Sequence, residues 1–140
     1  MHITDSERDY LASQTLGRLA TLRADGTLQN SPVGFDYDPD TGTIDIGGRA
    51  MGGTRKFANV AATGVAVLVI DDLASRDPWT VRGVEIRGRA EAISGIEPTS
   101  SYGSGEMIRL HPSRVISWGL DPDRPGMSGR TIPDPGPDDA

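Results

Sequence analysis

The segment Val81–Ile93 constrains the fold most strongly, because apolar and charged residues alternate along it. Successive side chains of a β-strand point to opposite faces of the sheet. The pattern therefore predicts one long strand, with an apolar face toward a core and a charged face toward solvent or a partner. The charged face comprises Glu85, Arg87, Arg89 and Glu91.

Further strand patterns lie on both sides of this segment. Residues 65–70 are all apolar and predict a strand that is buried on both faces. Asp25-Gly26 is a strong signal for a two-residue hairpin turn. Strands at this density, joined by hairpins, favour a mainly β fold: a six-stranded antiparallel barrel with short flanking helices. The expected strands are residues 16–23, 27–35, 43–48, 65–70, 81–93 and 106–118, and the expected helices begin after the capping residues Thr4 and Thr54.

Residues 121–140 differ in composition from the rest of the chain. They contain five of the ten prolines, five aspartates and only two arginines. Such a segment buries too little apolar area to offset the entropy that is lost on ordering. The sequence therefore predicts one folded domain over residues 1–120 and an acidic, proline-rich flexible tail over residues 121–140.

Net charge and cysteine content exclude several classes of function. A net charge of −6 disfavours nucleic acid and anionic membranes as partners. The chain has no cysteine and two histidines, so we expect no thiolate or multi-histidine metal site. The acidic N-terminus has the features of neither a signal peptide nor a transit peptide, and we therefore expect a cytoplasmic protein.

A glycine-rich stretch leads into the second expected helix. It contains Gly48 and Gly53, and the capping residue Thr54 is followed by Arg55 and Lys56. Two cations at the positive end of a helix dipole destabilise the helix unless an anion binds there. One alternative is that both side chains simply extend into water. We favour a phosphate or carboxylate site made of helix N–H groups, the threonine hydroxyl and both cations.

The expected second strand contains a polar stretch around a proline, Asn30-Ser31-Pro32-Val33. Proline within a strand indicates the edge of a sheet. One alternative is a simple exposed edge. The other is a strand that offers backbone N–H and C=O groups to a flat polar ligand.

Trp79 follows Asp77-Pro78 in an expected loop between two strong strands. A tryptophan in such a loop either folds back onto the barrel, or stacks on a cofactor or fills a dimer interface. His111 is interpreted as a structural histidine of the last strand. Two histidines assemble no serine–histidine–aspartate triad, so the catalytic residues stay unknown.

The order of these motifs resembles that of a known family. Residues 16–22, the Asp25-Gly26 turn, residues 31–35 and residues 52–60 look like the pyridoxamine 5'-phosphate oxidase-like split β-barrel family. Residues 67–72, 77–79 and 83–91 are similar to its actinobacterial branch, which uses the deazaflavin coenzyme F420.

The resemblance implies a homodimer of six-stranded split barrels of the FMN-binding type, with the cofactor sites at the subunit interface. The segment that matches Thr54 to Lys56 would hold the cofactor phosphate, and the strand that matches Asn30 to Val33 would line its rings. Trp79 would reach the site from the partner subunit. Arg49, Arg76 and Arg82 are candidates for binding the anionic tail that distinguishes F420 from FMN. The expected cofactor-binding residues are Asn30, Ser31, Pro32, Val33, Gly48, Gly53, Thr54, Arg55, Lys56, Trp79 and Arg82.

The leading hypothesis is therefore a reductase in which reduced F420 delivers a hydride to an electron-poor C=C bond of a small organic substrate. The resemblance extends to members that act late in polyketide antibiotic assembly, including tetracycline-type pathways. Two alternatives stay open: an FMN-dependent oxidoreductase of the same fold, and a non-enzymatic protein that binds or carries deazaflavin. The short chain and its acidic C-terminus argue against pyridoxamine phosphate oxidation itself.

Overall fold

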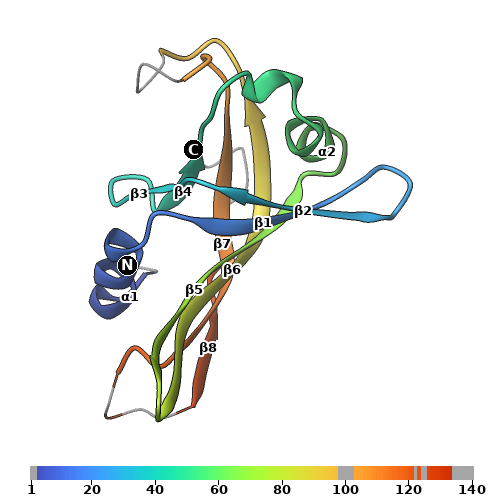
Figure 1. Cartoon of the computed structure of the whole chain (residues 1–140). Coiled ribbons are helices and arrows are strands. Elements are labelled where there is room, and N and C mark those ends of the chain that lie inside the picture. Colours follow the sequence, from blue (N-terminus) through green and yellow to red (C-terminus); the bar gives the residue numbers. More distant parts are fainter. Residues whose placement is uncertain (1–2, 98–102, 122, 124–125, 134–140) are drawn as a thin grey trace.

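The computed structural model describes residues 3–97, 103–121, 123 and 126–133. Its strands form one antiparallel sheet with the order β2-β1-β5-β6-β7-β4-β3, and β8 pairs with the end of β7. The sheet curls into a barrel, from which β5 and β6 extend as a long hairpin (Figure 1). The elements are α1 (Asp5–Ser13), β1 (Gly17–Leu22), β2 (Leu28–Val33), β3 (Asp36–Asp38), β4 (Thr43–Ile46), the 3₁₀ turn η1 (Met51–Gly53), α2 (Arg55–Thr63), β5 (Val65–Arg76), β6 (Trp79–Ile93), β7 (Met107–Trp118) and β8 (Met127–Thr131).

The predicted mainly β, antiparallel fold is confirmed, but the described residues form eight strands and not six. The additional strands are β3 and β8. β3 has three residues, which are too few to show an alternating pattern. β8 is largely exposed and joins the sheet through backbone pairing with β7. Its sequence therefore also shows no alternation of apolar and polar residues.

The structure corrects the predicted flexible tail for the segment around β8. Ile132, directly after β8, is 4% exposed and belongs to the core. Arg130 donates hydrogen bonds to both carboxylate oxygens of Glu7 on α1. Strand pairing and a partly buried ion pair therefore order a segment whose composition predicts disorder. The end of the predicted tail, residues 134–140, lies outside the described residues.

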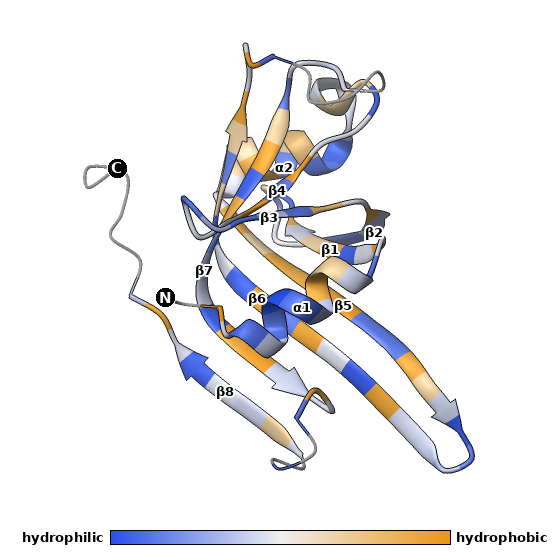
Figure 2. Ribbon diagram, turned by 90° about the vertical axis from the view of Figure 1, so that its left-hand side faces the viewer, coloured by the Kyte–Doolittle hydropathy of each residue, from blue (hydrophilic) through white to orange (hydrophobic). Residues whose placement is uncertain are grey.

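β5 and β6 show the predicted periods with one difference. Ile86 on β6 and Leu68 on β5 are fully buried in the core. Val65, on the opposite face of β5, is 45% exposed. The prediction that β5 is buried on both faces is therefore wrong for the single chain, which leaves the outward face uncovered. Figure 2 shows the hydrophobic residues along β5 and its long projection beyond the barrel.

The β1–β2 hairpin confirms a turn at Asp25-Gly26 and the edge position of β2. Its loop is longer than the predicted two residues, because the Arg23 N–H donates to the Thr27 carbonyl at 2.8 Å across three residues. Gly26 has a φ of +88°, a conformation that favours glycine. Asp25 accepts hydrogen bonds from the backbone N–H and the hydroxyl of Thr27. β2 begins the strand order of the sheet, so Pro32 costs no hydrogen bond in the sheet interior.

The two α-helices begin at the predicted caps. Thr4 and Glu7 form a capping box at the start of α1, and Thr54 caps α2. The side-chain amide of Asn59, on α2, donates to Thr21 Oγ1 at 3.1 Å and to Gln29 Oε1 at 3.3 Å. These contacts fix α2 against β1 and β2. Within the described ranges, no helix is long and apolar enough to cross a membrane.

Candidate functional site

The start of α2 is built by the glycine-rich stretch that precedes it. Ala50 has a φ of +46°, and η1 follows directly. The hydroxyl of Thr54 then donates to the Met51 carbonyl at 2.7 Å and accepts from the Phe57 N–H at 3.3 Å. The first N–H groups of α2 lack intrahelical acceptors, so they form a natural anion site.

Arg55 and Lys56 occupy the first turn of this helix, which contains no acidic residue. Neither side chain forms an ion pair or a hydrogen bond with any described residue, whereas Arg18, Arg82 and Arg109 each pair with an aspartate. Arg55 is exposed and Lys56 is half-buried. Two unpaired cations and the helix N-terminus create a region of positive potential at the start of α2, and such a region suits a phosphate or a carboxylate.

The predicted residues of β2 divide between the two faces of the strand. Ser31 pairs with Leu19 of β1, which is buried, so its side chain points inward together with Val33. Val33 is 6% exposed and packs in the core. The hydroxyl oxygen of Ser31 is buried and has no hydrogen-bond partner among the described groups. Such an orphaned polar atom fits a ligand group that completes its hydrogen bonding.

Asn30 and Pro32 point outward from β2, onto a surface that we call the open face. In register with them lie the outward side chains of β1 and β5. A groove of about 690 Å³ crosses this face, with Arg87 and Arg89 of β6 along one side. The open face consists of the outward residues Arg18, Ala20, Leu22, Leu28, Asn30, Pro32, Val65, Val67 and Val69. Arg18 is its one charged member and forms an ion pair with Asp71.

Trp79 and Arg82 lie on the projecting hairpin of β5 and β6. The structure places Trp79 at the start of β6 and not in a loop, and its side chain is 71% exposed. Both views of the molecule place the hairpin tip at the opposite end from α2 (Figures 1 and 2). Within one chain, the predicted residues at the start of α2 therefore lie next to the glycine-rich stretch that precedes the helix. Trp79 lies far from both.

Arg82 is held within the protein by a bidentate pair with Asp72. Its Nε lies 3.0 Å from Asp72 Oδ1, and its Nη2 lies 2.7 Å from Asp72 Oδ2. The Tyr10 hydroxyl donates to the same Oδ1 at 2.7 Å, and the guanidinium lies 5.3 Å from the centroid of the Tyr10 ring. The hydrogen bond from Arg82 lowers the pKa of Asp72. Because these contacts tie the hairpin to α1, the structure gives Arg82 a role in holding the hairpin.

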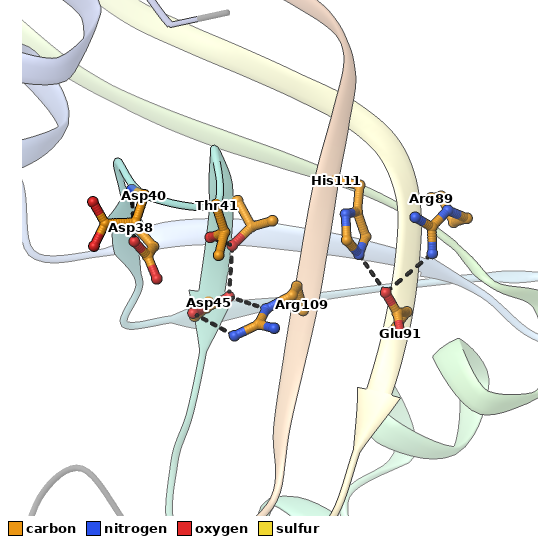
Figure 3. Close-up of polar contacts among 9 residues, drawn as sticks. Asp38, Asp40, Thr41, Asp45, Arg89, Glu91, Arg109 and His111 are labelled. Atoms are coloured by element: carbon orange, nitrogen blue, oxygen red, sulfur yellow. Dashed lines mark hydrogen bonds and ion pairs between the residues drawn. The ribbon is translucent and has the colours of Figure 1, made fainter. Parts of the chain in front are cut away.

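The sequence analysis missed the polar contacts on the outward side of β4, β6 and β7 (Figure 3). Asp45 accepts from Arg109 Nε at 3.0 Å. Glu91 accepts from Arg89 at 3.0 Å and also contacts His111 Nε2, which confirms the interpretation of His111 as a hydrogen-bonded strand residue. Alternation along β6 predicted this charged face, but only the register shows which charges pair.

A second missed contact joins the segment before β7 to the glycine-rich stretch. Ser104 Oγ accepts from the Met51 N–H at 3.0 Å and donates to the Gly48 carbonyl at 3.3 Å. A cavity of about 890 Å³ opens beside Gly47 and Gly48 and is lined in part by Phe35. Among the described residues, no group of three or more histidines or carboxylates could hold a metal ion.

Comparison with known proteins identifies the family of this chain. The family model described as pyridoxamine 5'-phosphate oxidase matches residues 3–127. A 5a,11a-dehydrotetracycline/5a,11a-dehydrooxytetracycline reductase of Streptomyces rimosus is 45% identical over 94% of each chain. An F420H(2)-dependent biliverdin reductase of Mycobacterium tuberculosis is 33% identical over 68% of this chain and 63% of its own length.

The fold also matches solved structures. A conserved hypothetical protein of Mycobacterium tuberculosis superposes with a TM-score of 0.66 at 21% identity, over 90% of this chain and 91% of that one. The chain therefore belongs to the pyridoxamine 5'-phosphate oxidase-like split-barrel family.

Proposed function

We propose that the protein is a coenzyme F420-dependent reductase that transfers a hydride to an electron-poor C=C bond of a polycyclic organic substrate. The observation that carries the proposal is the pair of unpartnered cations, Arg55 and Lys56, at the capped start of α2. The two reductase relatives support the reaction class. The 45% identical relative supports a substrate of the tetracycline type, and the 33% identical one supports F420 as the cofactor.

The residues of the site fit an anionic, planar cofactor. Arg55 and Lys56 would hold its phosphate through the free N–H groups at the start of the helix and through two charge-assisted side-chain contacts. Thr54 would support them as the cap, because its hydroxyl proton is already donated to the Met51 carbonyl. β2 has a neighbouring strand on one side only, so some of its backbone groups stay available to the ring system. When bound, reduced deazaflavin supplies the hydride, and the protein orients it and excludes water. The apolar side chains of the open face suit that exclusion.

In this proposal the protein acts as a homodimer that pairs through the open face. An uncovered apolar sheet face of this kind is typical of an interaction surface. The exposed Trp79 on the projecting hairpin would then reach the cofactor site of the partner subunit. Since Arg82 is held by Asp72, the cation near Trp79 that could bind an anionic cofactor tail is Arg76, which pairs with Trp79 in the strand register.

Titration with F420 and, separately, with FMN tests the proposal, with tryptophan fluorescence as the readout. Lys56→Ala is expected to weaken F420 binding about 10- to 100-fold, because one charge-assisted contact contributes about 1.5–3 kcal/mol. Arg8→Ala is the matched control, since it removes one exposed cation on α1. Unchanged affinity of the Lys56 variant, with an intact circular dichroism spectrum, would contradict the phosphate site.

The same titration separates the alternatives. Preference for FMN would place the protein among flavin-dependent oxidoreductases of this fold. Tight F420 binding without oxidation of reduced F420 by any conjugated enone would indicate a carrier protein. The proposed reductase requires F420 binding, and consumption of reduced F420 that depends on the enone.

A further inference from the structure

The segment that enters β7 packs against the stretch that builds the start of α2. Ser104 lies in this segment and is exposed at the surface, so it contributes nothing to the core. Its hydroxyl nevertheless makes two bonds to one backbone loop: it accepts from Met51 N–H at 3.0 Å and donates to the Gly48 carbonyl at 3.3 Å. One side chain thus bridges the two ends of the Gly48–Met51 turn.

This turn needs support from outside, because Ala50 within it has a φ of +46°. That left-handed region is unfavourable for a residue with a Cβ. Beyond the turn, the Met51 carbonyl accepts from both the N–H of Thr54 at 3.0 Å and its hydroxyl at 2.7 Å. The hydroxyl of Ser104 is therefore linked, through the peptide groups of Met51, to the residue that caps α2.

We infer that Ser104 is a positioning residue for the anion site. By holding the Gly48–Met51 turn, it keeps the free N–H groups of α2 and the side chains of Arg55 and Lys56 aimed at one ligand position. The ligand class is a phosphate ester. The identity of the cofactor rests on the proposed function, whereas the contacts of Ser104 with Met51 and Gly48 belong to the structure itself.

The test compares three variants with the wild type. Ser104→Ala removes both hydrogen bonds, whereas Ser104→Thr keeps the hydroxyl and should restore them. Ser94→Ala is the control, because Ser94 is exposed and its side chain makes no hydrogen bond with the described residues. The alanine variant at 104 is expected to bind F420 and inorganic phosphate about fivefold more weakly, while the threonine and Ser94 variants bind within twofold of wild type.

Hydrogen exchange of the unliganded protein supplies a second readout. Amides of residues 48–54 should exchange about fivefold faster in Ser104→Ala, with the melting temperature unchanged and wild-type exchange in Ser104→Thr. Faster exchange with unchanged phosphate and F420 affinity would overturn the inference, since Ser104 would then be only structural. Unchanged exchange would overturn it as well.

The two proposals fail in different ways. If the wild type binds inorganic phosphate but not F420, the proposed function fails while the phosphate affinities of the variants still decide the role of Ser104. If the wild type binds F420 and Ser104→Ala binds it equally well, the role of Ser104 is refuted and the proposed function stands.

Discussion

Replacing Glu7 by glutamine is expected to destabilise the fold by separating β8 from α1. The Glu7 side chain is 2% exposed, accepts from the Thr4 N–H at 3.0 Å, and pairs with both terminal nitrogens of Arg130. Glutamine keeps the size and the capping acceptor, so the change removes mainly the charge. It leaves the guanidinium of Arg130, which is 33% exposed, without its counterion.

The expected magnitude follows from this partial burial. Breaking a fully buried ion pair costs about 3–5 kcal/mol, and an exposed pair is worth less than about 1 kcal/mol. Water can still reach Arg130, so we expect a loss of about 2 kcal/mol in the free energy of unfolding. For a domain of this size, that lowers the melting temperature by about 6 °C. Asp5→Asn is the control, because the Asp5 side chain is 81% exposed and its loss should cost under about 0.5 kcal/mol.

The pH dependence supplies a second check. Burial opposes the charged form of Glu7, but hydrogen bonds from Arg130 and the Thr4 N–H outweigh it and lower the pKa of Glu7. A folded pKa below the unfolded value means that the contribution is complete above about pH 5 and disappears as pH falls through the folded pKa. The difference between wild type and Glu7→Gln should therefore persist at pH 7 and shrink below about pH 4.

Chemical denaturation at pH 7 and at low pH measures these values, and a double-mutant cycle isolates the pair. Arg130→Met alone leaves a buried carboxylate, so combining it with Glu7→Gln should cost less than the sum of the single changes by about 1 kcal/mol or more. Strict additivity, or a Glu7→Gln effect no larger than that of Asp5→Asn, would refute the reasoning.

Three further outcomes follow from the same structure. Truncation after residue 120 should lower the free energy of unfolding by several kcal/mol in urea denaturation, because it removes β8 and the buried Ile132; a flexible tail would leave stability unchanged. Tyr10→Phe should lower the free energy of unfolding by about 1 kcal/mol in the same assay, because it removes the hydrogen bond to Asp72. Burial and this hydrogen bond raise the pKa of Tyr10, so the variant should also lose a component that ionises above pH 10 in a titration followed by tyrosine absorbance. An unaltered titration would contradict this. Val67→Asp, on the open face, should convert the proposed dimer to a folded monomer in analytical ultracentrifugation, and an unchanged sedimentation coefficient would rule out pairing through this face.

Local patterns predicted the elements that position the candidate site. Thr54 as a cap, Asp25-Gly26 as a turn and Pro32 at an edge each follow from one or two residues and a backbone rule, and all three are confirmed. The cation pair at the start of α2 was likewise visible in the sequence, because neighbours in the chain stay neighbours in a helix. Whether that pair binds a cofactor stays a prediction.

Contacts between distant segments were not predictable in the same way. The sequence did not show that Arg82 pairs with Asp72, which happens because β5 and β6 place the two side by side. Whether Arg82 also contacts a cofactor stays a prediction. Ser104 gave no signal, since its role depends on the fold bringing residue 104 against residues 48–51. β8 was hidden for a similar reason, because its partners are a strand backbone and a glutamate near the other end of the chain.

The sequence by itself thus determined the strand and helix periods, the caps and turns, and the two adjacent cations at the start of α2, all of which depend on spacing along the chain. The tertiary structure alone decided which charges are neutralised, which apolar face of β5 stays uncovered, and which side chains support the candidate site. Those properties depend on strand register and on the order of strands in the sheet, and these arise from packing between segments far apart in the chain.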